Sequence, residues 1–293
     1  MSNKNDALGN RMKTYENVTR NYLTRRMPVI IRFDGKSFHS FTRGFKKPFD
    51  DVLVETMQQT MKYLCENIQG CVLGYTQSDE ITLVLVDYQN RDSCAWFDNN
   101  IQKIASVSAS MATMAFNKFF TENISQWMVT IYPVNSNREE EYLLKDFALR
   151  DKYINAAKKG AMFDSRVFNI PKEEVVNCLI WRQQDVTRNS IQSVGQANFS
   201  DKQLNGKRCN DIQDMLMLEK GINWNDYPTH LKRCSCCVKM PCKINEVTEH
   251  ETVRNKWVID TEIPIFTQNK DYVNRLVMGC NGRCKNFSAN PSI

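Results

Sequence analysis

Two features of membrane and secreted proteins are missing from this sequence. It has no apolar run long enough to cross a lipid bilayer, and its first residues are polar instead of forming a secretory signal. We therefore expect a cytosolic protein with no membrane partner. Internal repeats and low-complexity tracts are also absent. The 293 residues are long enough to bury a sizeable core and are expected to form one large domain or two.

A large excess of charge of one sign is missing as well. The net charge is only +6, which permits a polyanionic partner without requiring one. Hydrophobic residues make up 42% of the chain and charged residues 25%, the proportions of an ordinary folded protein. Composition alone therefore leaves the kind of partner open.

The 11 cysteines lack the spacing of a disulfide scaffold or of a regular zinc site. Most are scattered, and the late group of Cys234, Cys236, Cys237 and Cys242 does not form the paired knuckles of well-defined zinc sites. We interpret these side chains as reduced thiols that pack in the interior. Structural zinc at the late group is the alternative.

The central stretch of the sequence is a hairpin pattern that carries two adjacent acids. The runs 71–76 and 81–86 are rich in Val, Leu, Ile, Thr and Tyr, which favour strands. The corner between them holds Asp79 and Glu80. Such a corner is either a solvated turn or an acidic group at a sheet edge, and the hairpin by itself does not decide between them.

A third acid upstream favours the functional interpretation. The apolar run 27–33 predicts a strand that ends in Asp34 and Gly35, and 51–68 has helical spacing of its apolar residues. A right-handed crossover makes the strands before and after this helix parallel. If the third strand lies between them, Asp34, Asp79 and Glu80 converge at one edge. Clustered carboxylates repel one another without a cation, and Mg²⁺ prefers such ligands together with substrate phosphates.

The rest of the chain is assigned more coarsely. The polar segment 1–26 is either a helix against the first strand or a solvated lead-in, and the basic loop 42–48 either holds a triphosphate or is solvated. The polar stretch 187–206 would either contact phosphates and sugars or form a helix pair facing water. The other predicted elements are a helix at 94–119, a strand at 128–134, a connection at 135–159, a strand at 161–170, a helix from Pro171 to Asp185, a short helix at 209–219 and a strand-like run at 257–265.

Several of these segments together resemble the tRNA(His) guanylyltransferase family, whose members add nucleotides to RNA in the 3′-to-5′ direction. The likeness spans most of residues 20–240. The matching motifs, in order, are Ile31-Arg32-Phe33-Asp34-Gly35-Lys36-Ser37-Phe38-His39, Lys47-Pro48, Tyr75-Thr76-Gln77-Ser78-Asp79-Glu80 and Trp181-Arg182-Gln183-Gln184-Asp185. The resemblance implies an α+β fold with a polymerase- or cyclase-like palm, a ferredoxin-like βαββαβ sheet with helices on one face. It also implies a catalytic palm region at 1–138 and a mainly helical C-terminal region at 139–293, which adds the last palm strand and contacts RNA and nucleotide.

The resemblance further implies the site. Asp34, the Gly35 carbonyl and Asp79 are expected to bind two Mg²⁺ ions, and Glu80 occupies the position of the family's second essential acid. The expected nucleotide-binding residues are Lys36, Ser37, Phe38, His39, Lys47, Ser78, Lys103 and Asn189. The implied substrates are ATP, GTP or other nucleoside triphosphates and tRNA, and the implied assembly is a homotetramer.

Two departures from the eukaryotic members refine this expectation. The segment Thr187 to Ser193 replaces their His-Ile-Asn-Asn-Leu-Tyr-Asn, and Asn99-Asn100 replaces a basic pair. Both changes resemble the bacterial and archaeal guanylyltransferase-like branch, for which template-dependent repair of tRNA 5′ ends is implied. The alternatives are a palm-fold nucleotidyl cyclase-like enzyme and a catalytically inactive RNA-binding palm protein.

Overall fold

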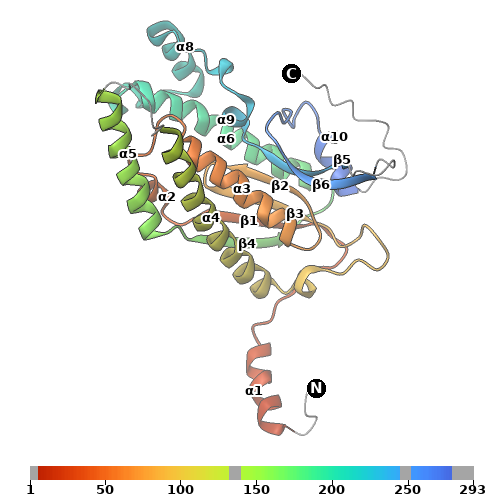
Figure 1. Cartoon of the computed structure of the whole chain (residues 1–293). Helices are drawn as coiled ribbons and strands as arrows, with labels where there is room; N and C mark the ends of the chain where they lie inside the picture. Colours follow the sequence, from red (N-terminus) through yellow and green to blue (C-terminus); the bar gives the residue numbers. More distant parts are fainter. Residues whose placement is uncertain (1–5, 132–139, 245–251, 279–293) are drawn as a thin grey trace.

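A six-stranded sheet forms the centre of the protein. The computed structural model describes residues 6–131, 140–244 and 252–278. Neighbouring strands of the sheet are antiparallel, in the order β4-β1-β3-β2-β5-β6 (Figure 1). The strands are β1 (Val29–Gly35), β2 (Cys71–Gln77), β3 (Glu80–Leu85), β4 (Phe163–Asn169), β5 (Cys236–Ile244) and β6 (Thr252–Asp260). Since β3 pairs with both β1 and β2, these two are parallel to each other, as the crossover argument predicted.

Helices of very different lengths connect and cover the strands. They are α1 (Ala7–Asn17), α2 (Phe38–Phe41), α3 (Asp51–Asn67), α4 (Ile101–Ile131), α5 (Glu140–Lys159), α6 (Glu174–Asn198), α7 (Asp201–Leu204), α8 (Cys209–Lys220), α9 (Thr229–Arg233) and α10 (Asp271–Met278), with short 3₁₀ turns at Trp96–Asn99 and Trp224–Asp226. In the described part of the chain, no helix is both long and apolar enough to cross a membrane.

The sheet is covered on both faces: α3 and α4 of the expected palm region cover one face, and α6 and α10 of the C-terminal region cover the other. Ile31 and Phe33 of β1 belong to a core with α3 and α4, whereas their neighbour Ile30 belongs to a second core with α6 and α10. Strands buried on both faces are nearly continuous apolar runs, which is the pattern of β1 and β2. The alternation expected of a sheet with one bare face is therefore weak in these strands.

Two segments between α3 and β4 differ from the sequence assignment. The strand predicted at 128–134 is the end of α4, which continues helically to Ile131, while 132–139 lie outside the described residues. Within 124–131 the apolar side chains of Ile124, Trp127, Met128 and Ile131 keep helical spacing, and this period outweighs the β propensity of Val129 and Thr130. The connection predicted at 135–159 contains the 20-residue α5.

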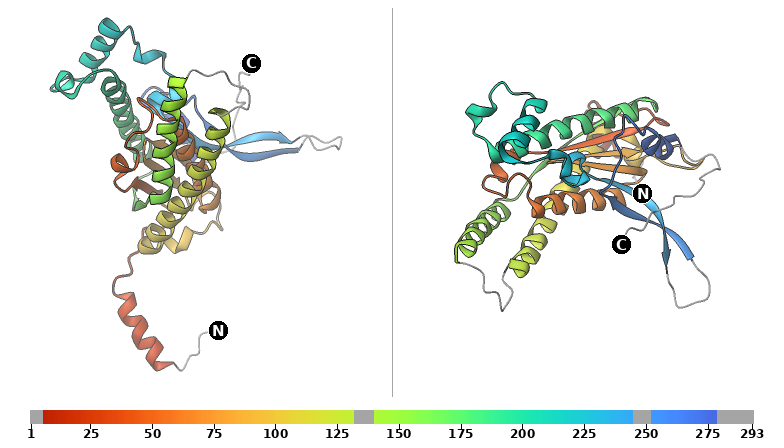
Figure 2. Two further views of the ribbon diagram at one scale, coloured as in Figure 1. Left: turned by 60° about the vertical axis from the view of Figure 1, so that its left-hand side comes forward. Right: turned by 90° about the horizontal axis from the view of Figure 1, so that it is seen from above.

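The C-terminal half is helical, but it also carries a hairpin that the sequence assignment missed in part. α6 is one continuous helix that includes both the segment before Asp185 and most of the polar stretch after it. β5 was not predicted, and the run at 257–265 is strand only as far as Asp260. The β5–β6 hairpin pairs with β2 only at Cys236 and Cys237 and extends beyond the sheet, whereas α1 stands apart from the body (Figure 2).

α5 is fixed to the start of α3 by a buried hydrogen bond. Tyr153 is 2% exposed and donates its hydroxyl to Asp50 Oδ2 at 2.6 Å. Asp50 also caps α3 by accepting from the backbone N–H of Leu53 at 3.0 Å. Burial raises the pKa of the Asp50 carboxyl, and the Tyr153 hydroxyl opposes this shift by stabilising the charged form.

We predict that Tyr153→Phe lowers the free energy of unfolding by about 1–3 kcal/mol, because the buried Asp50 carboxylate loses one of its hydrogen-bond donors. Urea denaturation measures the change. The matched control is Tyr63→Phe, because the hydroxyl of Tyr63 has no hydrogen-bond partner among the described residues, and its effect should stay below about 0.5 kcal/mol. Equal effects of the two substitutions would show that the Asp50 bond does not anchor α5.

Candidate active site

The end of β1 and the turn between β2 and β3 meet at one edge of the sheet. Asp34 lies directly opposite Glu80 in the β1–β3 register, and Gln77 lies opposite Glu80 in the β2–β3 register. The backbone N–H of Gly35 donates to the carbonyl of Asp79 at 3.2 Å, and this bond fixes the turn against β1. Ser78 reverses the chain in the left-handed region, with φ 52°. The structure thus brings Asp34, Gly35 and Asp79 together as predicted.

Gly35 permits the close approach of an aromatic ring below this edge. A Cβ at this position would lie 2.2 Å from the ring of Phe38, so any larger residue would displace the Phe38 ring. Phe38 is 4% exposed and packs among Phe41, Phe116 and Phe163. Its side chain therefore belongs to the core, and only its backbone groups remain for the nucleotide contact that the resemblance implied.

Negative charge accumulates at this edge. Burial raises the pKa of the Asp79 carboxyl, and the nearby charges of Asp34 and Glu80 raise it further, whereas hydrogen bonds from its own backbone and from Ser78 act in the opposite direction. Asp34 has a loose ion pair with Arg166 of β4, with 3.6 Å between the charged atoms, and both side chains are substantially exposed. A cation bound between Asp34 and Asp79 would relieve this repulsion.

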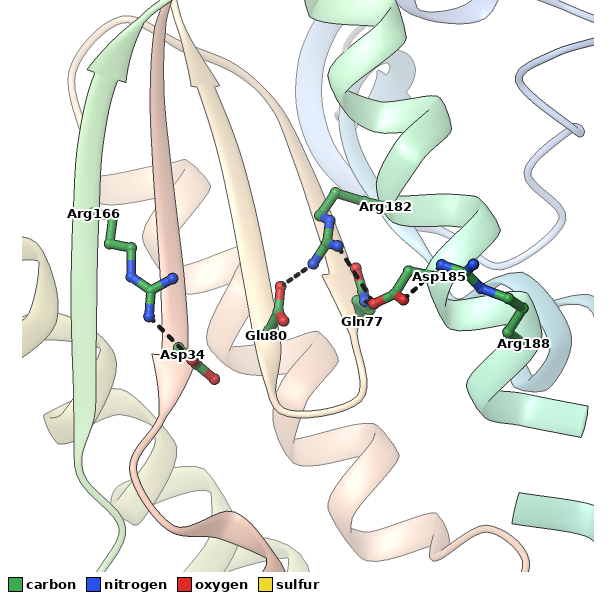
Figure 3. Close-up of polar contacts among 7 residues, drawn as sticks. All are labelled: Asp34, Gln77, Glu80, Arg166, Arg182, Asp185 and Arg188. Carbon is green, nitrogen blue, oxygen red and sulfur yellow. Dashed lines mark hydrogen bonds and ion pairs between the residues drawn. The ribbon is translucent and has the colours of Figure 1, made fainter. Parts of the chain in front are cut away.

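Asp34, Asp79 and Glu80 all lie at this edge, as the topology predicted, but Glu80 is also paired with a side chain of α6. Glu80 Oε2 accepts from the guanidinium of Arg182 at 2.8 Å (Figure 3), and the Arg182 side chain is only 7% exposed. Among the described residues, no three His, Cys, Asp or Glu side chains are grouped to hold a metal ion. The candidate metal position therefore consists of Asp34 and Asp79, with Gly35 beside them.

Arg182 belongs to a network of polar side chains. The family resemblance matched the motif that contains Arg182 but gave this residue no role. Asp185 lies one turn further along α6, and its Oδ2 accepts from Arg182 at 3.4 Å and from Gln77 at 2.9 Å. Its Oδ1 accepts from Arg188 at 3.0 Å. One signal in the sequence was available: Arg182 interrupts the apolar face of α6, and its i,i+3 spacing to Asp185 suits an ion pair.

A pocket of about 240 Å³ opens beside the acidic turn and brings together three of the expected nucleotide residues. We call it the Lys47 pocket. Lys47, Ser78 and Asn189 line it from the basic loop, the β2–β3 turn and α6, respectively. Sequence reasoning missed its other polar groups, which come from distant segments and include Gln58, His230, Cys234 and Ser235. Because Ser78 precedes Asp79, the pocket and the acids share one turn.

The remaining expected nucleotide residues are placed differently. Lys36, Ser37 and His39 are exposed in the segment that follows Gly35, close in sequence to the acidic edge. Lys103 is not brought to this edge within one chain. It lies in the first turn of α4, which hydrogen-bonds to Asn21 before the start of β1, and its amino group lies 4.6 Å from the ring centroid of Phe97.

The late cysteines occupy two separate cores. Cys236 packs with the α6 and α10 side of the sheet, and Cys237 with the α3 side, since neighbouring strand residues point to opposite faces. Burial raises the pKa of the Cys234 thiol to about 11 and that of Cys236 well above its usual value. Cys236 and Cys237 therefore face two different cores. The side chain of Cys242 lies outside the described residues.

Known proteins resemble the chain over most of its length. A sequence profile described as tRNAHis guanylyltransferase matches residues 9–171, more than half of the chain. A bacterial tRNA(His) guanylyltransferase-like protein solved in complex with ATP is 42% identical, with 92% of this chain and 99% of that chain covered and a TM-score of 0.74. One solved in complex with GTP is 39% identical, with 93% and 99% covered and a TM-score of 0.71. The tRNA(His) guanylyltransferase of Saccharomyces cerevisiae is 26% identical over 71% of this chain and 80% of its own length.

These matches, together with the mixed α/β fold, identify the protein as a nucleotidyltransferase. The chain belongs to the tRNA(His) guanylyltransferase family. The higher identity to the bacterial guanylyltransferase-like proteins than to the yeast enzyme agrees with the branch that the sequence departures indicated.

We predict that Arg182→Met destabilises the fold by about 2–4 kcal/mol, because Glu80 and Asp185 lose a buried partner. The matched control is Arg188→Met. The side chain of Arg188 is 58% exposed and pairs with the same Asp185, so its loss should cost about 0.5 kcal/mol or less. Urea denaturation compares the two. A loss for Arg182→Met no larger than for the control would refute the anchoring role of the buried guanidinium.

Proposed function

We propose that this protein adds nucleotides to the 5′ end of tRNA in the 3′-to-5′ direction, with a nucleoside triphosphate in the Lys47 pocket. The observation that carries this proposal is the shared turn: Ser78 lines the pocket, and Asp79 stands next to Asp34 at the sheet edge. Family membership and the ATP- and GTP-bound bacterial relatives support the same reading. They disfavour a cyclase, and the presence of both carboxylates disfavours an inactive binding protein.

Two Mg²⁺ ions fit this site as part of the proposal. Mg²⁺ is usually held by one or two carboxylates and completed by substrate phosphates, and Asp34 and Asp79 supply two carboxylates beside the pocket. When bound, the ions would lower the pKa of the attacking hydroxyl and neutralise the leaving group. Asp34, Asp79 and the Gly35 carbonyl are the proposed ligands. Glu80 is held by Arg182, so it acts as a positioning carboxylate that keeps the turn in place.

The proposed reaction consists of two displacements at phosphorus. The 5′-monophosphate of the RNA first attacks the α-phosphate of ATP, which forms an adenylylated 5′ end and releases pyrophosphate. The 3′-hydroxyl of the incoming nucleotide then attacks the activated 5′ phosphate and releases AMP. Lys47 and Asn189 would orient the triphosphate along the pocket. Neither step needs a covalent nucleophile from the protein, because positioning and charge neutralisation supply most of the acceleration.

The finer features of the fold and assembly belong to the same proposal. The β1–α3–β2–β3 unit with the acids at one edge supports a polymerase- or cyclase-like palm at 1–138, and β4 is the strand that the region 139–293 adds to it. A cytosolic location follows from the proposed tRNA substrate. The homotetramer stays a prediction from family resemblance. In such an assembly, Lys103 could contact the nucleotide bound to a partner chain, because it does not reach the acidic edge of its own chain.

We predict that Asp79→Ala lowers kcat for both chemical steps by at least on the order of 10³-fold and leaves the fold intact. Without metal its melting temperature should stay level or rise, since one of several repelling charges is removed. The matched control is Asp164→Ala, because Asp164 is an exposed acid directly opposite Asp34 on β4. Adenylylation by Asp79→Ala at the level of the Asp164 control would remove Asp79 from the metal site.

We also predict template-dependent addition. The segment Thr187 to Ser193 lacks the side chains of the eukaryotic members, so base pairing rather than the protein should select the nucleotide. The assay uses 5′-truncated tRNAs that differ only in the nucleotide facing the first vacant position, each offered all four triphosphates. The complementary nucleotide should be joined in every case and on several tRNA species. Addition of guanine alone, to tRNA(His) alone and whatever the opposing base, would contradict this.

A further inference from the structure

A second cleft lies on the side of α6 that faces away from Glu80. Its volume is about 520 Å³, and α6 lines it together with the segments around Trp224 to Arg233 and Ile265 to Thr267. Ile180, Gln184 and Thr187 recur at i, i+4 and i+7, so they form one side of the helix. Arg182 and Asp185 lie on a different side. We call this site the α6 cleft.

The charge of the α6 cleft favours an anion. The described residues that line it include Arg188 and Arg233 and no Asp or Glu. Arg188 is paired with Asp185, but Arg233 has no carboxylate within ion-pair distance among the described residues. The Nε of Arg233 is buried and has no hydrogen-bond partner in the described part of the chain. The charge that Arg233 brings to the cleft is therefore not balanced by a carboxylate, and a bound oxyanion would balance it.

The uncharged groups of the cleft favour RNA over a small anion. Gln184, Thr187, Asn225 and Thr267 provide amides and hydroxyls, which contact phosphate and sugar oxygens in protein–nucleic acid interfaces. The exposed side chain of Ile265 gives the cleft apolar surface against which a nucleoside would pack, and the mostly buried Trp224 forms part of the wall behind it. The volume is large enough for a nucleotide, whereas a lone phosphate would leave most of it empty.

Hydrogen bonds hold the walls of the cleft against α6. Gln183 is 4% exposed, donates to the carbonyl of Pro264 at 2.9 Å and accepts from the N–H of Phe266 at 2.8 Å. On the other wall, Trp224 donates its indole N–H to Ser190 Oγ at 3.0 Å. A cleft built in this way is preformed, so a ligand would not need to order it.

The same side chains connect the cleft to the acidic edge. Arg188 binds Asp185, which accepts on its other oxygen from Gln77 and Arg182. The carbonyl of Arg233 accepts from the hydroxyl of Tyr75 in β2, the strand that leads into the acidic turn, at 2.8 Å. We propose that the α6 cleft binds a phosphate and its nucleoside in the body of the RNA substrate, away from the reacting 5′ end. This inference rests on the proposed function.

The test introduces a charge at Thr267, which lines the cleft, is exposed and makes no side-chain hydrogen bond to another described residue. Thr267→Glu should weaken binding of a 5′-truncated tRNA about tenfold, whereas the uncharged Thr267→Gln should bind like the parent. Arg233→Gln should also weaken binding and reduce the slope of log K against log salt by about 1. The affinity for ATP should be unchanged in all three variants. Fluorescence anisotropy gives the tRNA affinities, and isothermal titration gives those for ATP.

The outcomes separate this inference from the proposed function. If the parent protein neither binds tRNA nor extends it, the proposed function and the cleft assignment both fall. If the parent does both, and Thr267→Glu binds tRNA as well as Thr267→Gln, only the cleft assignment is overturned. If Thr267→Glu loses affinity for ATP but not for tRNA, the cleft binds a free nucleotide and not RNA. This result would also overturn the cleft assignment.

Discussion

The ion pair between Arg182 and Glu80 is the interaction on which the site depends most. A guanidinium as buried as that of Arg182 is tolerated only with partners, and its partners come from the β2–β3 hairpin and from α6 itself. Sliding or rotating α6 on the sheet would leave a buried charge unpaired. The pairing therefore fixes the register of a helix that also carries Asn189 of the Lys47 pocket and the inner wall of the α6 cleft.

Much of the sheet and its acidic edge could be predicted because they follow from local patterns. β1, β2 and β3 are short apolar runs, each ended by a turn residue or an acid, and handedness limits how a strand, a helix and a strand connect. Asp34 and Asp79 are strand-end residues, so the topology alone brings them together. The meeting of Lys47, Ser78 and Asn189 in one pocket was implied only by family resemblance, since they come from three separate elements.

The features that escaped prediction depend on partners far away in the sequence. Arg182 and Glu80 are separated by 102 positions, and the sequence around either residue does not indicate that the two form a pair. β5 contains Pro241 and pairs with β2 at only two positions, so it lacks the pattern of a central strand. α5 is polar over much of its surface, and what identifies it as part of the body is the buried Tyr153, whose partner Asp50 is 103 positions away.

Opposite charges on the two sides of α6 suit two parts of one polyanionic substrate. In the proposed mode of action the acidic edge would bind a cation and, through it, the reacting phosphates, whereas the α6 cleft would bind the phosphates directly. Asp185 keeps these regions distinct, because its two oxygens bind Arg182 and Gln77 on one side and Arg188 on the other. Since Asp185 already balances much of the Arg188 charge, the attraction of the cleft for an anion depends mainly on Arg233. Arg233 therefore has two roles in the proposal. Its guanidinium recognises the body of the RNA, and its backbone carbonyl holds β2 by accepting from the hydroxyl of Tyr75.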